Sequence, residues 1–336
     1  MKTRKLRDLT VSEIGIGCMG FSHGYGQIPS EEYSIEAIRK AYHYGCTFFD
    51  TAEAYSPNLQ GIGHNELIVG KAVKGFRKDI VLATKLHIHT EEVGADGVYP
   101  VIRRHLEASM ERLGTDYVDL YYLHRLNLDV PVEEVAGAMG RLIDEGLVRG
   151  WGLSQVGVGT ISAAQAVTPV SAVQNIYSMV ERDVEKEVIP YCLENRIGVV
   201  PFSPIASGFL SGKITADTQF EKVDDVRNFV PQLKKENIIA NQPILDVLAD
   251  FSARKNATNA QISLAWMLHK YPNVVPIPGS KNQERILENL GASEVELTGE
   301  EFQALETALG ACTIHGHRGF EEQQGGRMKD WDREKK

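Results

Sequence analysis

Short apolar segments recur along the chain, and each is separated from the next by a stretch whose apolar residues repeat with helical spacing. The apolar segments span residues 14–21, 47–55, 79–87, 117–125, 148–156, 171–178, 197–205 and 273–280. Apolar strands that are each followed by a helix are typical of a parallel sheet covered by helices. Eight such units over roughly 290 residues predict an α/β fold, a single (β/α)8 barrel of the TIM type, for which about 250 residues is usual.

The connecting stretches carry signals for the start and end of helices. Ser30 precedes Glu31 and Glu32 at the head of one amphipathic stretch, and Gly45 follows it. A serine cap and acidic residues suit the amino end of a helix, and glycine suits its carboxyl end. We expect a short N-terminal β-hairpin, one barrel domain over residues 1–312 and a polar C-terminal extension over residues 313–336.

An open, doubly wound sheet is the alternative architecture. It predicts G-x-G-x-x-G after an early strand, with an acidic residue ~20 residues further on. Gly15, Gly17 and Gly20 have the glycine spacing. The next candidate acid, Asp50, lies ~30 residues beyond them and inside the following apolar segment, which does not fit the pattern. The sequence therefore favours the barrel.

Composition and charge exclude several classes of function. The net charge is −9 and the charged residues are scattered, so no basic stripe indicates a nucleic acid or an anionic membrane surface as partner. No apolar stretch approaches the ~20 residues of a membrane-spanning helix, and residues 1–21 do not match a secretory leader. The cysteines are widely spaced, which argues against a zinc knuckle or a disulfide framework; they are Cys18, Cys46, Cys192 and Cys312. We expect a cytoplasmic protein.

Four ionisable residues follow three consecutive predicted strands. The second apolar segment ends with Asp50 and Tyr55, the third ends with Lys85, and the fourth ends with His124. In a barrel of this type, catalytic groups come from the carboxyl ends of several strands and meet at one mouth. A lysine at the end of a core strand needs a partner, and Asp50 on the neighbouring strand is suited to be that partner. The arrangement predicts a reaction site.

Two H-x-H pairs, His87 with His89 and His315 with His317, raise the question of a metal. Residues two apart on a strand share a face, so His87 and His89 could bind one ion together. No third ligand is apparent nearby in the sequence, so we expect no metal site. His89 lies just beyond the predicted strand that ends with Lys85, so we expect it to line a substrate pocket rather than bind a metal.

The chain resembles the aldo-keto reductases from about Lys5 to about Cys312. The resemblance is carried by D-T-A-E-A-Y at 50–55, T-K at 84–85, Y-L-H at 122–124, G-L-S at 152–154, Gln174, and the segment I-P-G-S-K-N-Q-E-R-I-L-E-N at 277–289. It implies that the family's catalytic tetrad corresponds to Asp50, Tyr55, Lys85 and His124, and that the chain reduces aldehyde or ketone carbonyls to alcohols.

The residue types suit that chemistry. Hydride addition to a carbonyl leaves an alkoxide that must be stabilised and protonated, and Tyr55 can do both. A tyrosine pKa near 10 is high for this task, but a nearby cation lowers such a value by about 1 to 3. Lys85 would be this cation, Asp50 would hold it, and His124 would orient the carbonyl.

The resemblance also implies a bound NADPH. Ser154 and Gln174 would hold the nicotinamide amide, Phe202 would stack on its ring, and Gln155 stands where the family often has Asn. Small residues and Lys213 in the loop 203–213 suit a pyrophosphate, and Arg285 with its neighbours would hold the ribose phosphate and favour NADPH over NADH. The complete set implied for the cofactor is Gly17, Cys18, Met19, Asp50, Ser154, Gln155, Gln174, Phe202, Ser203, Ile205, Gly208, Lys213, Gly279, Ser280, Lys281, Arg285, Glu288 and Asn289.

Two other functions stay open at the level of sequence. Lysines at strand ends in barrels can be nucleophiles, so a Schiff-base lyase or aldolase that uses Lys85 is one alternative. A cofactor-binding regulatory subunit with little turnover is the other, because some relatives in the family have that role. The expected partner is a small carbonyl substrate, and its identity, the physiological direction of the reaction and the oligomeric state are not predicted.

Overall fold

The computed structural model describes residues 1–57 and 61–319. Residues 320–336 of the predicted C-terminal extension lie outside the described residues, so only residues 313–319 of that extension are considered below.

A parallel sheet forms the centre of the molecule, and its strands lie in sequential order from β3 to β9. Among the described residues the strands of this sheet are β3 (Ile16–Gly17), β4 (Phe48–Asp50), β5 (Val81–Leu86), β6 (Val118–Leu123), β7 (Val148–Ser154), β8 (Ala172–Gln174) and β9 (Gly198–Val199). A separate antiparallel hairpin consists of β1 (Thr3–Leu6) and β2 (Leu9–Ser12). The predicted N-terminal hairpin is therefore confirmed.

The eighth predicted strand, 273–280, is not a regular strand in the structure. Val274 makes an isolated parallel bridge to Val199. Hydrogen bonds nevertheless join this segment to both edges of the sheet: Val275 N–H donates to the Val199 carbonyl over 2.8 Å, and Gly15 N–H donates to the Pro276 carbonyl over 2.9 Å. The segment thus lies between β9 and β3 and closes the ring, which confirms the (β/α)8 barrel while correcting the extent of its last strand.

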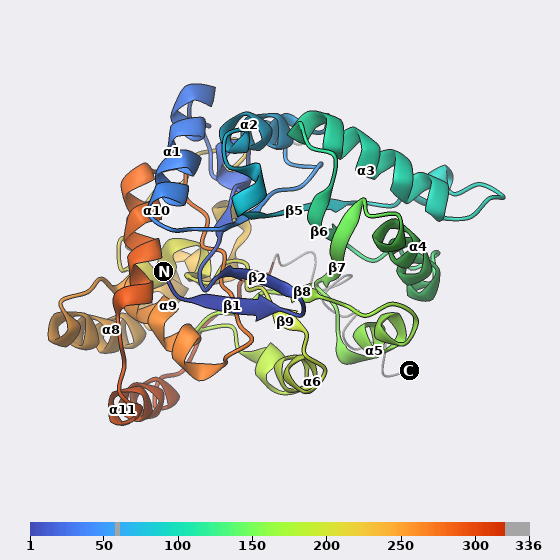
Figure 1. The fold of residues 1–336 in the computed structure, drawn as a ribbon. Helices are drawn as coiled ribbons and strands as arrows, with labels where there is room; N and C mark the ends of the chain where they lie inside the picture. The colour runs from blue at the N-terminus through green and yellow to red at the C-terminus, as the bar shows by residue number, and fades with distance from the viewer. Residues whose placement is uncertain (58–60, 320–336) are drawn as a thin grey trace.

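Helices surround the barrel, as Figure 1 shows. The α-helices of the described residues are α1 (Glu31–His43), α2 (His64–Val73), α3 (Tyr99–Leu113), α4 (Val132–Asp144), α5 (Val158–Val167), α6 (Val188–Glu194), α7 (Lys235–Ala240), α8 (Gln242–Lys255), α9 (Asn259–Lys270), α10 (Gln283–Leu290) and α11 (Gly299–Gly310). The Ser30 hydroxyl accepts a hydrogen bond from Tyr33 N–H, so Ser30 caps α1 as predicted. Within the described part of the chain, no helix has the length and apolar composition needed to cross a membrane.

The N-terminal hairpin closes one end of the barrel. Leu6 and Val11 from the hairpin belong to the same buried cluster as Phe48, Val81 and other barrel-interior residues near the amino ends of the strands. Gly198 on β9 allows this close approach, because a Cβ atom there would lie 2.2 Å from Leu6 Cδ2. Apolar packing therefore fills the amino end of the barrel and leaves the carboxyl ends of the strands to form a pocket.

Candidate functional site

The alternation of side chains along each strand brings the predicted site residues together. Phe48 on β4 and Ala83 on β5 face the barrel interior, where they belong to its apolar cluster. Two residues further along these strands come Asp50 and Lys85, which therefore face the same interior space. The same step of two residues recurs at the carboxyl ends of β6, β8 and β9: Tyr122 to His124, Ala172 to Gln174, and Val200 to Phe202.

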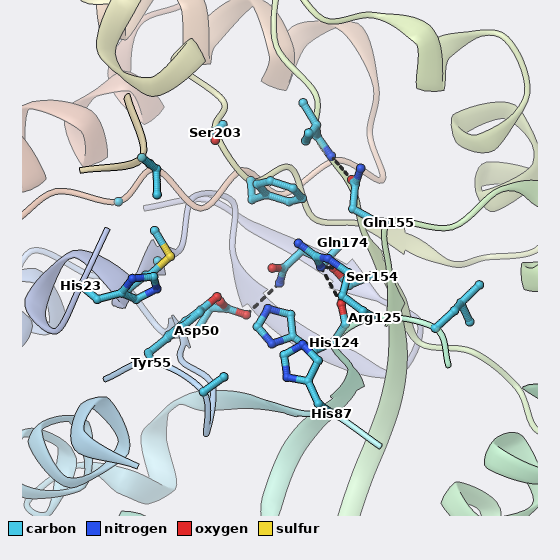
Figure 2. A pocket seen from close by; sticks show the side chains of 18 of the residues that line it. His23, Asp50, Tyr55, His87, His124, Arg125, Ser154, Gln155, Gln174 and Ser203 are labelled. Atoms are coloured by element: carbon cyan, nitrogen blue, oxygen red, sulfur yellow. Dashed lines mark hydrogen bonds between the residues drawn. The ribbon is translucent and has the colours of Figure 1, made fainter. Parts of the chain in front are cut away.

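Asp50, His124, Gln174 and Phe202 line a cavity of about 880 Å³ at the carboxyl ends of the strands. Figure 2 shows Asp50, Tyr55 and His124 on one side of it and Ser203 on the other. Apolar side chains such as Leu126, Ile176 and Val226 form other parts of the lining. A concave, mixed apolar and polar pocket with several ionisable groups is the usual form of a small-molecule site.

The Lys85 ammonium is fully buried and has three oxygen partners among the described residues. It donates to the Asp50 carboxylate, to the Thr51 carbonyl over 2.7 Å and to the Tyr55 hydroxyl over 3.2 Å. Burial acts to lower the pKa of Lys85, but Asp50 and Tyr55 outweigh it, so the pKa of Lys85 lies above its ordinary value. The lysine is held as a cation, which makes it a poor amine nucleophile and weighs against the Schiff-base alternative.

Tyr55 lies at the floor of the pocket with only 9% of its surface exposed. Burial raises the pKa of Tyr55, while the positive charges of Lys85 and Arg125 act in the opposite direction. The net direction is upward, which is opposite to the effect expected from Lys85 alone. The physical reason is the loss of hydration around the phenol, a cost of the ionised form that the sequence pattern does not reveal.

His124 lies beside Tyr55, with 5.6 Å between the ring centroids and the rings almost perpendicular. Its Nδ1 atom is buried and has no hydrogen-bond partner among the described residues. Burial, followed by the positive charge of Arg125 and of Lys85, holds the pKa of His124 well below its ordinary value. The ring is therefore neutral near pH 7 and can donate or accept one hydrogen bond at each nitrogen according to its tautomer.

Polar side chains on β7 and β8 form the next part of the lining. Gln174 Nε2 donates to Asp50 Oδ2 over 2.8 Å, and Ser154 Oγ accepts from Arg125 Nη1 over 2.9 Å. Gln155 lies in left-handed backbone with φ of 56°, and its amide oxygen accepts from Ile176 N–H over 2.8 Å. The Gln155 side chain, which is longer than that of Asn, thus connects the ends of β7 and β8. This structural contact explains a Gln at position 155 without any contact to a ligand.

The residues implied for the cofactor divide into two groups. Those that line the pocket are Gly17, Met19, Asp50, Ser154, Gln155, Gln174, Phe202, Ser203 and Gly279. Those outside its lining are Cys18, Ile205, Gly208, Lys213, Ser280, Lys281, Arg285, Glu288 and Asn289. Cys18 is fully buried and its N–H donates to the Asp50 carbonyl over 2.8 Å, so it supports the strand end from behind.

The loop that follows β9 has an unusual backbone. Ser203, Ala206, Ser207 and Gly208 all have positive φ values, and residues 206–211 form the 3-10 helical element η6 (Ala206–Ser211). Ser207 Oγ is buried without a hydrogen-bond partner among the described residues. Turns in which left-handed residues follow residues of negative φ, as Ala206 follows Ile205, can direct successive backbone N–H groups toward one side, which is a common way to bind an anion. The sequence analysis did not select Ser207, because its orphaned hydroxyl is visible only in three dimensions.

The start of α10 is exposed to solvent, whereas the pocket floor is buried. Asn282 caps this helix through Arg285 N–H, and the Arg285 side chain is exposed. Lys281 Nζ donates to the carbonyls of Tyr25 and Gln27, over 2.8 and 2.6 Å. Glu288 forms an ion pair with Lys213 at 3.2 Å, which connects α10 to the loop after β9.

Several pocket residues were missed by sequence reasoning. They include His23, Tyr25, Arg125, Asn127 and Arg318. Arg125 directly follows His124, and this position at a strand end was a signal that could have been used. Arg318 offered no such signal: it comes from the C-terminal segment, and its Nε atom donates to Ser203 Oγ over 2.9 Å.

The H-x-H pairs have different surroundings. His87 and His89 both line the pocket, and the His87 ring lies 4.5 Å from the His124 ring. His315 and His317 lie in the C-terminal segment, where Asn241 Nδ2 donates to the His315 carbonyl over 2.8 Å. Within residues 1–57 and 61–319, no group of three or more His, Cys, Asp or Glu side chains is arranged to hold a metal ion.

Comparisons with known proteins concern the fold and the family of the chain. The model of the aldo/keto reductase family matches residues 13–309. A probable aldo-keto reductase 1 of Glycine max is 36% identical over 312 residues, 92% of this chain and 88% of that protein. Two similar structures are the holo form of the aldo-keto reductase AKR11C1 of Bacillus halodurans (27% identity, 96% and 99% coverage, TM-score 0.72) and a Klebsiella pneumoniae aldo-keto reductase in complex with NADPH (25% identity, 91% and 95% coverage, TM-score 0.70). The chain therefore belongs to the aldo-keto reductase family of oxidoreductases.

Proposed function

We propose that this protein reduces aldehyde or ketone carbonyls to alcohols with NADPH, and that Tyr55 is the general acid. The observation that carries the proposal is the set of contacts among Tyr55, Lys85 and Asp50 at the pocket floor. The Tyr55 hydroxyl lies 3.2 Å from Lys85 Nζ, and Lys85 is ion-paired with Asp50. These contacts support Tyr55 as the proton donor of the pocket, with the Lys85 cation beneath it to stabilise the conjugate base.

The protonation states of Tyr55, Lys85 and His124 suit carbonyl reduction near neutral pH. Tyr55 is protonated near neutral pH, because the ordinary tyrosine pKa is about 10 and burial raises it further, so its hydroxyl can give a proton to the carbonyl oxygen. The Lys85 ammonium then stabilises the phenolate that this transfer leaves. A neutral His124 can donate a hydrogen bond to the same carbonyl oxygen and orient it, since its ring adjoins that of Tyr55.

Residues of the pocket and of the loop after β9 fit a dinucleotide. Gln174 and Ser154 present polar groups on neighbouring strand ends of the pocket, and Phe202 presents an aromatic ring. In the loop, outside the pocket lining, the orphaned Ser207 hydroxyl lies in a left-handed turn suited to phosphate oxygens. Arg285 would hold the phosphate on the adenosine ribose, with Ser280, Lys281, Glu288 and Asn289 around that end. When it is bound, NADPH supplies a hydride to the carbonyl carbon. The complex of the Klebsiella pneumoniae relative with NADPH supports this choice of cofactor.

The domain organisation and the location of the protein are part of the same proposal. We infer one barrel domain over residues 1–312, followed by a C-terminal extension over 313–336. The contacts of His315 and Arg318 with Asn241 and Ser203 support an extension whose described part packs on the barrel. A small carbonyl compound is the proposed partner and the cytoplasm the proposed location, which is consistent with free cysteines at Cys18, Cys46, Cys192 and Cys312.

A steady-state assay with NADPH and a panel of aldehydes and ketones tests the proposal. The matched variant is Tyr55→Phe, which removes the hydroxyl alone. We expect it to lose carbonyl reduction by at least about a hundredfold, the lower range for general acid catalysis, and to keep NADPH affinity in a fluorescence titration. A Phe variant that keeps most of its turnover would refute the role of Tyr55. A wild-type protein that binds NADPH without reducing any carbonyl would favour the regulatory subunit.

A further inference from the structure

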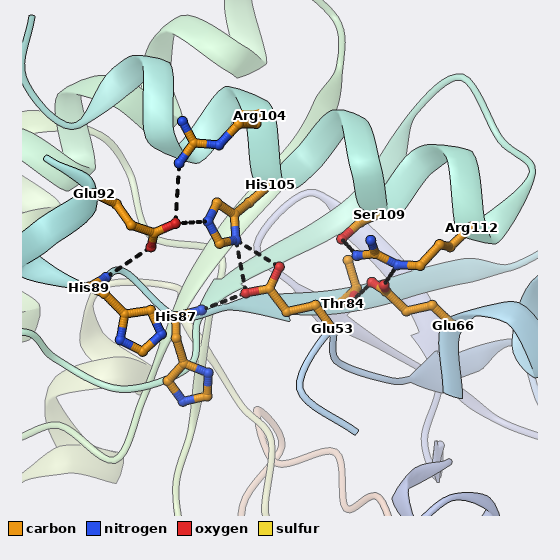
Figure 3. Close-up of polar contacts among 10 residues, drawn as sticks. All are labelled: Glu53, Glu66, Thr84, His87, His89, Glu92, Arg104, His105, Ser109 and Arg112. Atoms are coloured by element: carbon orange, nitrogen blue, oxygen red, sulfur yellow. Dashed lines mark hydrogen bonds and ion pairs between the residues drawn. The ribbon is translucent and has the colours of Figure 1, made fainter. Parts of the chain in front are cut away.

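A histidine on α3 lies between two carboxylates beside the pocket. His105 Nδ1 lies 2.9 Å from Glu53 Oε2, and its Nε2 lies 3.1 Å from Glu92 Oε1. Figure 3 shows the imidazole ring directly between these two groups. Glu53 belongs to the turn after β4, two residues before Tyr55, and Glu92 belongs to the 3-10 element η4 (Thr90–Glu92).

Each of these carboxylates also holds the backbone of the pocket wall. Glu53 Oε1 accepts from His87 N–H over 2.9 Å, and Glu92 Oε2 accepts from His89 N–H over 3.3 Å. Residues 87–91, here called the wall segment, all line the pocket. His105 itself is not part of the lining, so any influence it has on a ligand is exerted through Glu53, Glu92 and the wall segment.

The two contacts of His105 require a charged ring. A neutral imidazole has one N–H group and one lone pair, so it can donate to only one of two carboxylates and directs its lone pair at the other. An imidazolium donates at both nitrogens. Because both of its ring nitrogens face carboxylate oxygens at hydrogen-bond distance, the observed geometry is that of a protonated His105.

The surrounding charges favour the same state. The hydrogen bond to Glu53 raises the pKa of His105, and burial opposes this only in part. Other ionisable groups around the bridge are Arg104, which donates to Glu92 over 3.2 Å, His87 and His89 on the wall segment, Tyr121 of β6, and the Glu66–Arg112 pair beyond Glu53.

We propose that protonated His105 is a positioning residue that holds the wall segment in its substrate-binding position by bridging Glu53 and Glu92. The inference rests on the proposed carbonyl reduction and concerns how its substrate pocket is kept in shape. Loss of the proton leaves a lone pair facing one carboxylate. The contact with Glu92 opens first, because the Glu92 side chain is 24% exposed whereas that of Glu53 is 4% exposed and also accepts the His87 N–H group.

The direction of the pH effect follows from the raised pKa. The bridge is complete below the pKa of His105 and is lost as the pH rises through it. His124 has a depressed pKa and Tyr55 a raised one, so their own ionisations fall below and above this range. KM for the carbonyl substrate should therefore rise on mild alkalinisation, by about fivefold, the low end of typical coupling between sites, while kcat changes little.

The experiment combines NMR titration of the histidine ring protons with KM and kcat measured across pH. His105→Gln removes the second donor, and His43→Gln, at an exposed site on α1, is the matched control. We expect a pKa for His105 above the ordinary value of about 6.5, a KM that is high at all pH values in His105→Gln, and a wild-type profile in His43→Gln. His105→Lys restores a cation, and its KM should stay low to higher pH.

The outcomes separate this inference from the proposed function. A His105 pKa at or below about 6.5, or a His105→Gln protein that keeps the KM profile of the wild type, would overturn the inference even if carbonyl reduction is normal. A wild-type protein that reduces no carbonyl would contradict the proposed function. The NMR titration needs no substrate, so in that case it still decides whether His105 is the protonated bridge.

Discussion

The floor of the pocket and the start of α10 both contain charged residues, but their charges are satisfied in different ways. At the floor, Lys85 is fully buried, and its ammonium group donates to Asp50, Thr51 and Tyr55. At α10, Arg285 is exposed, and Lys213 and Glu288 form an ion pair that is partly open to solvent. The charges of the floor are thus paired within the protein, whereas those at α10 stay largely hydrated.

The largest effect should come from breaking the floor with Lys85→Met. This change leaves the Asp50 carboxylate buried and unpaired, which costs about 3–5 kcal/mol of stability, and it removes the cation beside Tyr55. We expect a clear fall in melting temperature and a loss of turnover of at least about a hundredfold. Lys71→Met is the control, because the Lys71–Glu31 pair is exposed and is worth less than about 1 kcal/mol. Equal effects of both changes would contradict the distinction between the two regions.

Arg285→Ala tests the exposed region. A charge-assisted contact to the ribose phosphate contributes about 1.5–3 kcal/mol, so NADPH affinity should fall by roughly ten- to hundredfold while NADH affinity and stability stay almost unchanged. Dissociation constants for both cofactors at fixed ionic strength measure this, because a phosphate contact depends on salt. Lys74→Ala, another exposed cation, serves as the control. Equal losses for NADPH and NADH would mean that Arg285 supports only the local structure.

The pH dependence of kcat tests the account of the floor, because the proposed effect of His105 acts on KM and leaves kcat almost unchanged. Tyr55 can serve as the proposed proton donor only while it is protonated, and burial raises its pKa, so kcat should be lost only as the pH rises above the ordinary tyrosine value of about 10. Beyond the Tyr55 pKa, kcat should fall about tenfold per pH unit. A fall in kcat centred near pH 8 would show that the positive charges of Lys85 and Arg125 lower the Tyr55 pKa more than burial raises it.

The smallest effect is expected for Lys213→Ala. Its side chain is 49% exposed and its ion pair with Glu288 is screened by solvent, so the free energy of unfolding should change by less than about 1 kcal/mol. NADPH affinity should fall only a few-fold, because the proposed pyrophosphate site relies mainly on backbone N–H groups of the loop. Urea denaturation and fluorescence titration provide the two measurements. A loss of NADPH affinity larger than that of Arg285→Ala would mean that Lys213 contributes more to NADPH binding than Arg285 does.

The sequence by itself determined the barrel and the residues gathered at its mouth. The reason is local: side chains alternate along a strand, so an apolar run that ends in Asp50, Lys85 or His124 specifies both the strand and the face on which that residue lies. The family resemblance carried the same information from about Lys5 to about Cys312. The length of the last strand was less predictable, because residues 273–277 close the ring through hydrogen bonds to partners distant in the chain, at Val199 and Gly15.

Only the tertiary structure decided properties that depend on neighbours from several elements. Burial reversed the expected direction of the Tyr55 pKa, since desolvation is set by everything that surrounds the phenol. Arg318 lines the pocket from the C-terminal segment. His105 on α3 contacts Glu53, in the turn after β4, and Glu92, in η4. No local sequence pattern encodes such contacts. Sequence spacing determines which face of a helix or strand a residue lies on, whereas the fold determines which other residues that face contacts.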